Sequence, residues 1–312
     1  MKPKMIDLFA GCGGLSHGFI QAGYENIGFV EKWEPAITTF LKNHPKALLL
    51  GKDITKIDNK SLMPYKGKVE IIAGGPPCQG FSLAGKRKRS DKRNQLYKEY
   101  LRFVDIIEPN TVLIENVHGL LSMRDHDNEK IINKIISRLI SKGYFVSYKV
   151  LKASDYGVPQ DRKRLIIVAK KLDLFPKPSG KPKTVIESIQ DLPKEENAVN
   201  GHQFFKPKAE TLERIKKLQQ GEKLCQKFNF SRQRLHADKP SKTIVTKPLY
   251  IHPYEDRFLS PRELARLQSF PDDFYLCGSK TDMVTQIGNA VPPLMAEAIA
   301  RKLIGGNQNE SQ

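Results

Sequence analysis

Short apolar runs alternate with longer amphipathic stretches over the first 170 residues of the chain. The runs end at glycine, proline or acidic residues and predict buried strands, while the stretches have the period of about 3.6 residues that predicts helices. This alternation predicts an α/β fold with a doubly wound, mainly parallel sheet. The expected strands are residues 5–9, 27–30, 47–50, 69–73, 111–114, 145–151 and 165–169. The expected helices are residues 14–20, 34–42, 96–108 and 129–142.

The pattern changes after Lys170. Residues 171–254 are rich in proline, lysine and glutamine, with one helical stretch at 210–220 and few clear strands. This change predicts a second, smaller domain. Order returns at Ser260, which forms with Glu263 the capping-box pattern of a helix start. We expect that helix to end near residue 269, followed by a loop at 286–293, a last helix up to residue 303 and a disordered tail at 305–312.

The charge balance points to a polyanionic partner. Lysine and arginine number 52 against 34 aspartate and glutamate residues, which gives a formal net charge of +18 over 312 residues. Much of the excess is local, in residues 86–93, 170–183 and 232–247. Basic clusters separated by neutral segments favour a binding surface, and nucleic acid is the first candidate.

The four cysteines lie far apart and form no C-x-x-C pair. This argues against a disulfide framework and a structural zinc site, and it favours a reducing compartment. The histidines His202, His236 and His252 are not spaced as metal ligands, so we expect no metal. No run of about 18 apolar residues exists, and a strand-like run begins within a few residues of Met1, so we expect neither a membrane span nor a signal peptide.

A glycine-rich turn connects the first strand to the first helix. Gly11, Gly13 and Gly14 bring the backbone close to a ligand, but Ser16 stands where a dinucleotide fingerprint has its third glycine. The turn therefore favours an adenosine-bearing ligand without a pyrophosphate. Glu31 ends the second strand about 20 residues later, where an acid hydrogen-bonds ribose hydroxyls. Trp33 is placed to cover an adenine, and Asp53 to meet its amino group.

A lone thiol follows the fourth expected strand. The strand ends in two glycines and two prolines, and Cys78 comes next. A cysteine in such a turn is more commonly a small apolar residue than a nucleophile, and these residues alone leave both interpretations open. The basic segment 79–94 is long for a structural connection, which favours a functional loop. Glu115 ends the strand 111–114, and burial there would raise its pKa enough for it to donate a proton.

Several of these segments together resemble the DNA (cytosine-5)-methyltransferases. Residues 7–14 are similar to the first motif of that family, Glu31 with Trp33 to the second, and Asp53 with Ile54 to the third. Residues 75–82 resemble the nucleophile motif, 115–117 the catalytic-glutamate motif, and 160–164 the paired-arginine motif. Residues 257–274 and 286–293 resemble the ninth and tenth motifs. The likeness spans nearly the whole chain except residues 171–256.

The resemblance implies a Rossmann-like methyltransferase that uses S-adenosylmethionine and yields S-adenosylhomocysteine. It implies a discontinuous cofactor-binding and catalytic domain, 1–170 plus 276–312, with the last helix packed beside the first strand. Residues 171–275 would form the target recognition domain and hinge. The cofactor residues implied are Phe9, Ala10, Gly11, Cys12, Gly13, Gly14, Glu31, Trp33, Asp53, Ile54, Pro76, Leu96, Asn289 and Val291.

The resemblance also assigns the chemistry, which is transfer of a methyl group to C5 of a cytosine in a specific double-stranded DNA sequence. Cys78 would add to C6, Glu115 would protonate or hydrogen-bond N3, and Arg162 with Arg164 would hold the cytosine O2. Because the duplex hides these atoms, the base must be flipped out. The expected DNA contacts are Gln79, Ser82, Lys86 and Arg87 in the basic loop, and Arg232, Gln233, Arg234 and Thr243 beyond it.

Other functions fit the sequence less well. A zinc deaminase needs P-C-x-x-C, but Phe81 occupies the second cysteine position, and a nicotinamide dehydrogenase would leave Cys78 and Glu115 unexplained. A binding module without activity conflicts with the presence of every motif residue. An RNA methyltransferase acting on tRNA is the main alternative, because one branch of the family has that substrate. The resemblance further implies a cytoplasmic prokaryotic monomer on nucleoid DNA, related in function to a restriction endonuclease without forming a complex with it.

Overall fold

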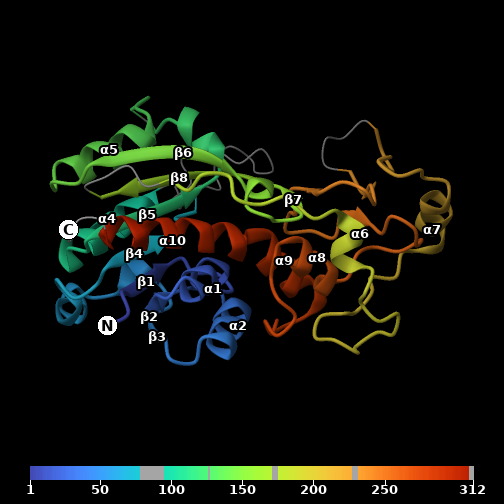
Figure 1. Cartoon of the computed structure of the whole chain (residues 1–312), viewed down its shortest axis with the longest axis horizontal. Helices are drawn as coiled ribbons and strands as arrows, with labels where there is room; N and C mark the ends of the chain where they lie inside the picture. The colour runs from blue at the N-terminus through green and yellow to red at the C-terminus, as the bar shows by residue number, and fades with distance from the viewer. Residues whose placement is uncertain (78–94, 126, 171–174, 227–230, 309–312) are drawn as a thin grey trace.

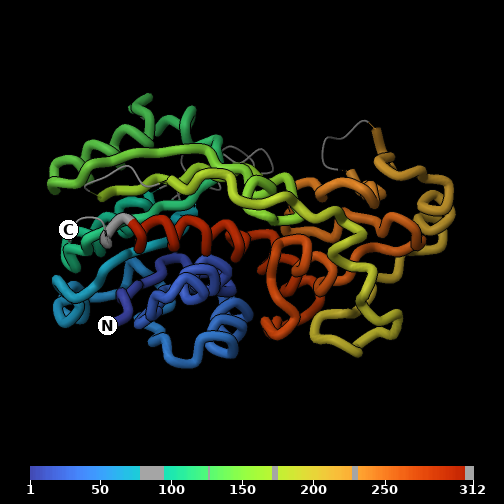
Figure 2. The backbone as a smooth tube through the Cα atoms, in the orientation of Figure 1, coloured from blue at the N-terminus to red at the C-terminus, as the bar shows by residue number. Residues whose placement is uncertain are grey.

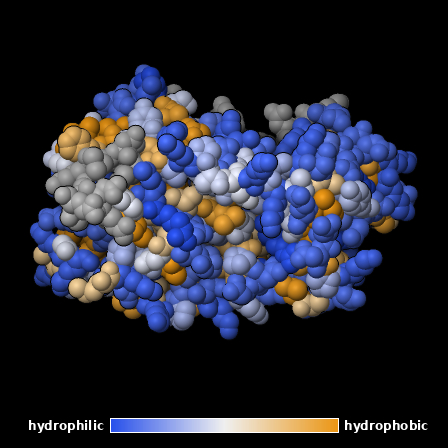
Figure 3. All heavy atoms as spheres, viewed as in Figure 1, coloured by the Kyte–Doolittle hydropathy of each residue, from blue (hydrophilic) through white to orange (hydrophobic). Residues whose placement is uncertain are grey.

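The structure is a computed structural model that describes residues 1–77, 95–125, 127–170, 175–226 and 231–308. Two lobes lie side by side in Figures 1 and 2. One holds the N-terminal strands and helices together with the last helix, and the other holds the segment around residues 185–260. Polar side chains cover most of the face shown in Figure 3, including much of the second lobe.

A seven-stranded sheet forms the centre of the first lobe, in the order β3-β2-β1-β4-β5-β8-β6. The pairs among the first five strands are parallel, whereas β8 runs antiparallel to both β5 and β6. The predicted α/β fold with a mainly parallel, doubly wound sheet is confirmed. The strands are β1 (Lys4–Leu8), β2 (Glu25–Val30), β3 (Leu48–Gly51), β4 (Ile71–Gly74), β5 (Thr111–Asn116), β6 (Val146–Lys152) and β8 (Lys163–Ala169).

Helices cover both faces of this sheet, which explains why its central strands are apolar on both sides. On one face, Tyr100 of α4 packs over the sheet and donates its hydroxyl to Ile72 O and Leu113 O, each at 2.9 Å. On the other face, Phe19 of α1 and Met295 of α10 pack together. The helices are α1 (Gly14–Gln21), α2 (Glu34–Asn43), α3 (Asn59–Leu62), α4 (Leu96–Ile107), α5 (Ile131–Ile140) and α10 (Pro293–Gln308).

The last helix returns to the beginning of the chain. α10 packs against α1, and Met295 shares a core with Met5 of β1, as the resemblance implied. Gly18 allows this contact, because a side chain there would meet Pro293 O and, at 2.6 Å, the Cβ of Ala296. The two ends of the chain are thus parts of one packed unit.

Short elements make up the second lobe in the part of the chain that the structure describes. They are α6 (Val185–Ile189), α7 (Ala209–Lys216), β9 (Gln233–Arg234), β10 (Ser241–Lys242), β11 (Tyr250–Ile251), α8 (Pro261–Leu267) and α9 (Lys280–Asn289). A further short strand, β7 (Gln160–Asp161), belongs to the first lobe. β9 pairs with β11, whereas β7, which directly precedes β8, pairs with β10. The lobes are therefore joined by a strand pair as well as by the chain itself.

Three expected boundaries differ in the structure. Residues 286–289 are the last turn of α9 and not a loop. This helix begins at Lys280, where Ser279 and Asp282 form a capping box. α10 continues to Gln308, beyond the expected end at residue 303, and α7 ends at Lys216. The capping box predicted at Ser260 is present, with Glu263 donating its amide to the Ser260 hydroxyl. Among the described residues, no helix is both long and apolar enough to cross a membrane.

The contact between α1 and α10 leads to a test of stability. We expect Gly18→Ala to lower the free energy of unfolding by about 1–3 kcal/mol, because the added methyl group has no space between the helices. Gly119→Ala is the matched control, since a side chain at Gly119 would meet nothing within 4 Å. Urea unfolding of both variants measures the difference. Equal stability of the two variants would show that the helices separate at little cost.

Candidate functional site

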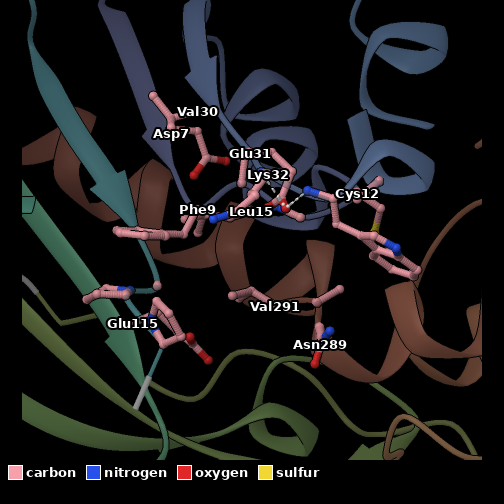
Figure 4. A pocket seen from close by; sticks show the side chains of 18 of the residues that line it. Asp7, Phe9, Cys12, Leu15, Val30, Glu31, Lys32, Glu115, Asn289 and Val291 are labelled. Atoms are coloured by element: carbon pink, nitrogen blue, oxygen red, sulfur yellow. Dashed lines mark hydrogen bonds between the residues drawn. The ribbon is translucent and has the colours of Figure 1, made fainter. Parts of the chain in front are cut away.

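A cavity with a volume of ≈ 880 Å³ opens where β1, β2, β3, β4 and β5 end. Ligands of open α/β sheets bind at these carboxyl ends, and the volume suits a nucleoside-sized molecule. All the predicted cofactor residues except two line this cavity. The residues that line it are Phe9, Ala10, Gly11, Cys12, Glu31, Trp33, Asp53, Ile54, Pro76, Leu96, Asn289 and Val291. Figure 4 shows Phe9 and Glu115 on one side of the cavity and Asn289 and Val291 on another.

The two exceptions are Gly13 and Gly14, which support the turn from behind. Gly13 has φ 95°, and a side chain there would meet His44 at 2.9 Å. At Gly14 it would meet Val291 O at 2.5 Å. These glycines are therefore needed for close packing, and neither is among the lining residues, so their contact with the cofactor stays a prediction.

Glu31 holds the cofactor turn to the second strand. One carboxylate oxygen accepts the amide of Gly11 at 2.8 Å, the bond drawn in Figure 4, and the other accepts the amides of Lys32 and Trp33, each at 2.8 Å. Three donors on one carboxylate fix its orientation at the edge of the cavity. Gly11 and Glu31, which are 20 positions apart in the sequence, are thus in direct contact.

Asp53 lies at the outer end of the cavity as an ionised group. Lys32 Nζ is 3.0 Å from Asp53 Oδ2, and the Thr55 hydroxyl donates to Oδ1 at 2.8 Å. These hydrogen bonds, that of Lys32 first, lower the pKa of Asp53 to about 2. Lys32 lines the cavity as well, although the sequence analysis did not name it.

Asp7 also lines the cavity; it lies in the segment that resembles the first motif, although the sequence analysis gave it no role of its own. It lies in β1, is 1% exposed, and accepts the Ser16 hydroxyl at 2.5 Å on Oδ2. Burial, opposed by the Ser16 hydrogen bond, raises the pKa of Asp7 to about 7. The available signal was an acid inside an otherwise apolar strand, since such residues are seldom fully buried.

Glu115 and Arg164 form an ion pair at the inner end of the cavity. β8 runs antiparallel to β5 with Asn116 opposite Leu165, so the start of β8 lies beside the end of β5. Arg164 Nε is consequently 2.7 Å from Glu115 Oε1, and both side chains are almost buried. Burial lowers the pKa of Arg164, and the adjacent Glu115 carboxylate counteracts this. The two residues predicted to act on one base therefore meet.

Arg162 has a connecting role beside the one predicted. Its side chain is 1% exposed and donates from Nη1 to Ile244 O at 2.9 Å and from Nη2 to Gly288 O at 2.8 Å. It also lines the cavity, and its Nε has no hydrogen-bond partner within the protein, so its contact with the cytosine O2 stays a prediction. Burial lowers the pKa of Arg162, and Arg164 lowers it further. Arg162 connects the sheet to the segments that carry β10 and α9.

The segment before Cys78 passes close to this ion pair. Gly75 has no space for a side chain, because a Cβ would lie 2.9 Å from Glu115 Oε2. Asn116 donates its amide to Pro76 O at 2.9 Å, and Pro77 lines the cavity. Cys78 itself lies outside the described residues, as do the predicted DNA contacts Gln79, Ser82, Lys86 and Arg87.

Comparison with known proteins matches residues 3–305 to the C-5 cytosine-specific DNA methylase family. The chain belongs to this family. As a member, it is a DNA cytosine-5 methyltransferase of the kind found in restriction-modification systems. The fold and the motif residues of the methylase agree with that membership.

Similar proteins cover almost the whole length of the methylase. It is 38% identical to the type II methyltransferase M1.HphI of Haemophilus parahaemolyticus, over 99% of this chain and 89% of that protein. It is 34% identical to M.DdeI of Desulfomicrobium norvegicum, over 96% and 88% of the two chains. A putative DNA modification methyltransferase of an Escherichia coli prophage has a similar structure, with a TM-score of 0.83 and 30% identity over 97% of this chain and 99% of that one.

The predicted base-reading residues of the methylase separate into two groups. Gln233 and Arg234 are buried: Gln233 donates to Gly221 O at 2.5 Å, and Arg234 donates to three backbone carbonyls and to Asp256. These bonds hold the second lobe together, and the predicted base contacts of Gln233 and Arg234 stay predictions. Arg232 is exposed with its guanidinium 5.0 Å from the Phe258 ring centre. Thr243 is half-buried and donates to Asp161 O at 2.9 Å.

Two further groups bear on the chemistry. Cys12 is buried in the cofactor turn, and burial raises the pKa of its thiol to about 12, so it is not a thiolate at neutral pH. Within the described part of the chain, no three His, Cys, Asp or Glu side chains are grouped so as to hold a metal ion.

The role of Arg162 leads to a second test. We expect Arg162→Met to loosen residues 241–246, because the carbonyls of Ile244 and Gly288 lose their donors, at about 1–3 kcal/mol for each buried group. Amide hydrogen exchange of this segment should then accelerate roughly tenfold or more. Arg232→Met, on the surface, is the control and should leave exchange there unchanged. If amide hydrogen exchange of residues 241–246 were unchanged in Arg162→Met, Arg162 would not be what holds this segment to the sheet.

Proposed function

We propose that this methylase transfers a methyl group from S-adenosylmethionine to C5 of a cytosine flipped out of double-stranded DNA, through a covalent bond between Cys78 and C6. The observation that carries the proposal is the ion pair of Glu115 and Arg164 in the wall of the cofactor cavity. A carboxyl group and a guanidinium facing the same cavity as an adenosine site are suited to hold one polar base against a methyl donor.

The cavity fits S-adenosylmethionine in its chemistry. When bound, this cofactor supplies a methyl group on a positively charged sulfur. Glu31 would accept the ribose hydroxyls and Asp53 the adenine amino group, while Trp33 and Ile54 would contact the adenine ring. The acidic groups Asp7, Glu31 and Asp53 suit a ligand that carries positive charge.

Cys78 would make C5 reactive. Its thiolate adds to C6, and the electron pair displaced from the C5–C6 bond moves into the ring toward N3. Glu115, ionised in the ion pair, would first take up a proton from solvent and then share it with N3 as this charge develops, while Arg164 would hydrogen-bond O2 and hold the Glu115 carboxyl. C5 would then take the methyl group of the cofactor, whose carbon–sulfur bond breaks with the electron pair left on the sulfur of S-adenosylhomocysteine. A base would remove the C5 proton, N3 would return its proton to Glu115, and the bond between the Cys78 sulfur and C6 would break to restore the thiolate. Arg162 lines the same cavity with an unpaired Nε and would be the second donor to O2.

The second lobe would read the DNA. We propose residues 171–275 as recognition domain and hinge, with residues 1–170 and 276–312 forming the catalytic domain. Arg232 and Thr243 remain proposed contacts on this side, and Gln79, Ser82, Lys86 and Arg87 on the other. The net charge of +18 supports binding along a phosphate backbone. The enzyme would act as a cytoplasmic prokaryotic monomer, on the same sequence as a restriction endonuclease but without forming a complex with it.

Transfer of label tests the reaction. We expect incubation with tritiated S-adenosylmethionine to label duplex DNA, and nuclease digestion to recover the tritium as 5-methylcytosine. A parallel reaction with tRNA tests the alternative that the enzyme is an RNA methyltransferase. Label in tRNA and none in duplex DNA would overturn the proposed substrate, and label on adenine or on N4 of cytosine would overturn the proposed reaction.

The role of Cys78 has its own test. Cys78→Ser should lower transfer by about 10³-fold or more, because a hydroxyl is a far weaker nucleophile than a thiolate at neutral pH. Binding of S-adenosylhomocysteine should stay within about twofold, since the cavity is intact. Cys277→Ser is the matched control and should transfer at the normal rate. Full activity of Cys78→Ser would exclude the covalent route.

A further inference from the structure

Two buried glutamines meet where the lobes join. Gln160 of β7 and Gln268, the residue that follows α8, are both 0% exposed. Gln160 Nε2 donates to Gln268 Oε1 and lies 3.4 Å from Leu267 O. A primary amide has an oxygen that accepts and an NH2 group that donates, so a buried pair of amides needs partners at both of its ends. The partners of this pair show what it connects.

At one end of the pair, both backbone groups of Ile244 are bound. Gln160 Oε1 accepts the Ile244 amide at 2.8 Å, and Arg162 Nη1 donates to the Ile244 carbonyl at 2.9 Å. Alternate residues of an extended chain point to the same side, which explains how both side chains reach one residue. Ile244 directly follows Thr243, the proposed DNA contact. Two side chains of the first lobe therefore set where Thr243 lies.

At the other end, the pair caps α9. A helix leaves its last carbonyls without a full set of partners inside the helix. Gln268 Nε2 donates to Ile287 O and to Ala290 O, each at 2.9 Å. Ala290 lines the cofactor cavity, whereas neither glutamine does. The pair thus reaches from the segment at Thr243 to the wall of the cavity.

The direction of both amides is fixed by these partners. Because the Ile244 amide can only donate, Gln160 must turn its oxygen toward it and its NH2 group toward Gln268. Because the carbonyls at the end of α9 can only accept, Gln268 must turn its NH2 group toward them and its oxygen toward Gln160. The two requirements agree, so each amide holds the other in the one orientation that satisfies every partner. A fully satisfied buried network of this kind specifies one arrangement of the elements around it.

The two regions that the pair connects are in direct contact. At Gly288 of α9, a side chain would meet Val245 O at 2.6 Å and Thr246 N at 2.7 Å. Thr285, one turn earlier and also in the cavity lining, donates its hydroxyl to Thr246 O at 3.5 Å. Residues 243–246 therefore cannot move along α9 without breaking contacts beside the cavity.

We propose that Gln160 and Gln268 are positioning residues for DNA, which hold residues 243–246 in a fixed place relative to the cavity that receives the flipped base. Neither side chain would touch DNA or the cofactor. Because the segment is already ordered, DNA binding would not lose free energy to ordering it. The inference rests on the proposed methyl transfer to duplex DNA, and it names the side chains that place the proposed contact at Thr243.

Steady-state methylation with tritiated S-adenosylmethionine provides the test. Gln160→Met keeps the volume of the side chain and removes its amide. We expect the KM for duplex DNA to rise about tenfold, because the Ile244 amide and Gln268 lose buried partners, while kcat stays within about threefold. The Kd of S-adenosylhomocysteine should stay within about twofold, since the donors to the cavity wall remain. An unchanged KM would overturn the inference, and so would an equal loss of cofactor binding, which indicates general loosening of the fold.

Gln268→Met extends the test to the other end of the pair. It removes the donor to Ile287 O and Ala290 O, so we expect S-adenosylhomocysteine to bind about 3–10-fold more weakly in addition to the rise in KM for DNA. Because the two side chains act as a pair, the double variant should raise this KM no more than about twofold beyond Gln268→Met. Increases that multiply in the double variant would show that the glutamines act separately and would overturn the inference.

A matched control and the unmodified protein complete the experiment. Gln190→Met, at an exposed glutamine that follows α6, should leave KM, kcat and cofactor binding unchanged. If the variants do not fold, the unmodified methylase decides: the Ile244 amide should exchange its hydrogen as slowly as the core of the sheet, and fast exchange would overturn the inference. If the unmodified protein labels no duplex DNA, the proposed function fails, whereas a normal KM in Gln160→Met refutes the positioning role alone.

Discussion

The reversed direction of β8 is the constraint on which the site depends. If every strand were parallel, the start of β8 would lie at the far edge of the sheet from the end of β5. The antiparallel register sets Asn116 opposite Leu165 instead, and it brings the paired-arginine segment to the edge where the cofactor cavity opens. Two residues 49 positions apart in the chain, Glu115 and Arg164, thereby form one buried ion pair. A pair of this kind is a poor source of stability but a precise way to orient two groups.

The same short segment joins the two lobes. β7 pairs with β10, Gln160 accepts the amide of Ile244 at 2.8 Å, and Arg162 donates to the carbonyls of Ile244 and Gly288. Gly288 itself lies close to the backbone at Val245, with no space for a side chain between them. The position of the second lobe is therefore coupled, through hydrogen bonds at fixed distances, to the strand that carries Arg164. The second lobe and the ion pair of Glu115 and Arg164 are therefore positioned by the same short segment.

Much of the fold and cavity was predictable because local patterns decide them. The strand–turn–helix at residues 5–20 and the acids that end β2 and β3 follow the rule that ligands bind at the carboxyl ends of parallel strands. Asp7 lies in the segment that resembles the first motif but was given no role, because its polarity is hidden in an apolar strand and its partners Ser16 and Asn26 are met only when α1 and β2 pack. The hydrogen bonds of Arg162 and Arg234 to buried backbone carbonyls were not predictable for a related reason. Those carbonyls belong to segments that lie far from the two arginines in the sequence.

The amino-acid sequence by itself determined the layered α/β architecture and pointed to most of the residues that line the cavity, since periodicity, turn residues and motif spacing are local properties of the chain. Only the tertiary structure decided which arginine meets Glu115 and which one joins the lobes, because Arg162 and Arg164 differ in nothing that their sequence neighbours reveal. It also decided that Asp7 faces the cavity with an unpaired oxygen. Burial and hydrogen-bond partners are properties of the packed chain, and they set the charge and direction of each group.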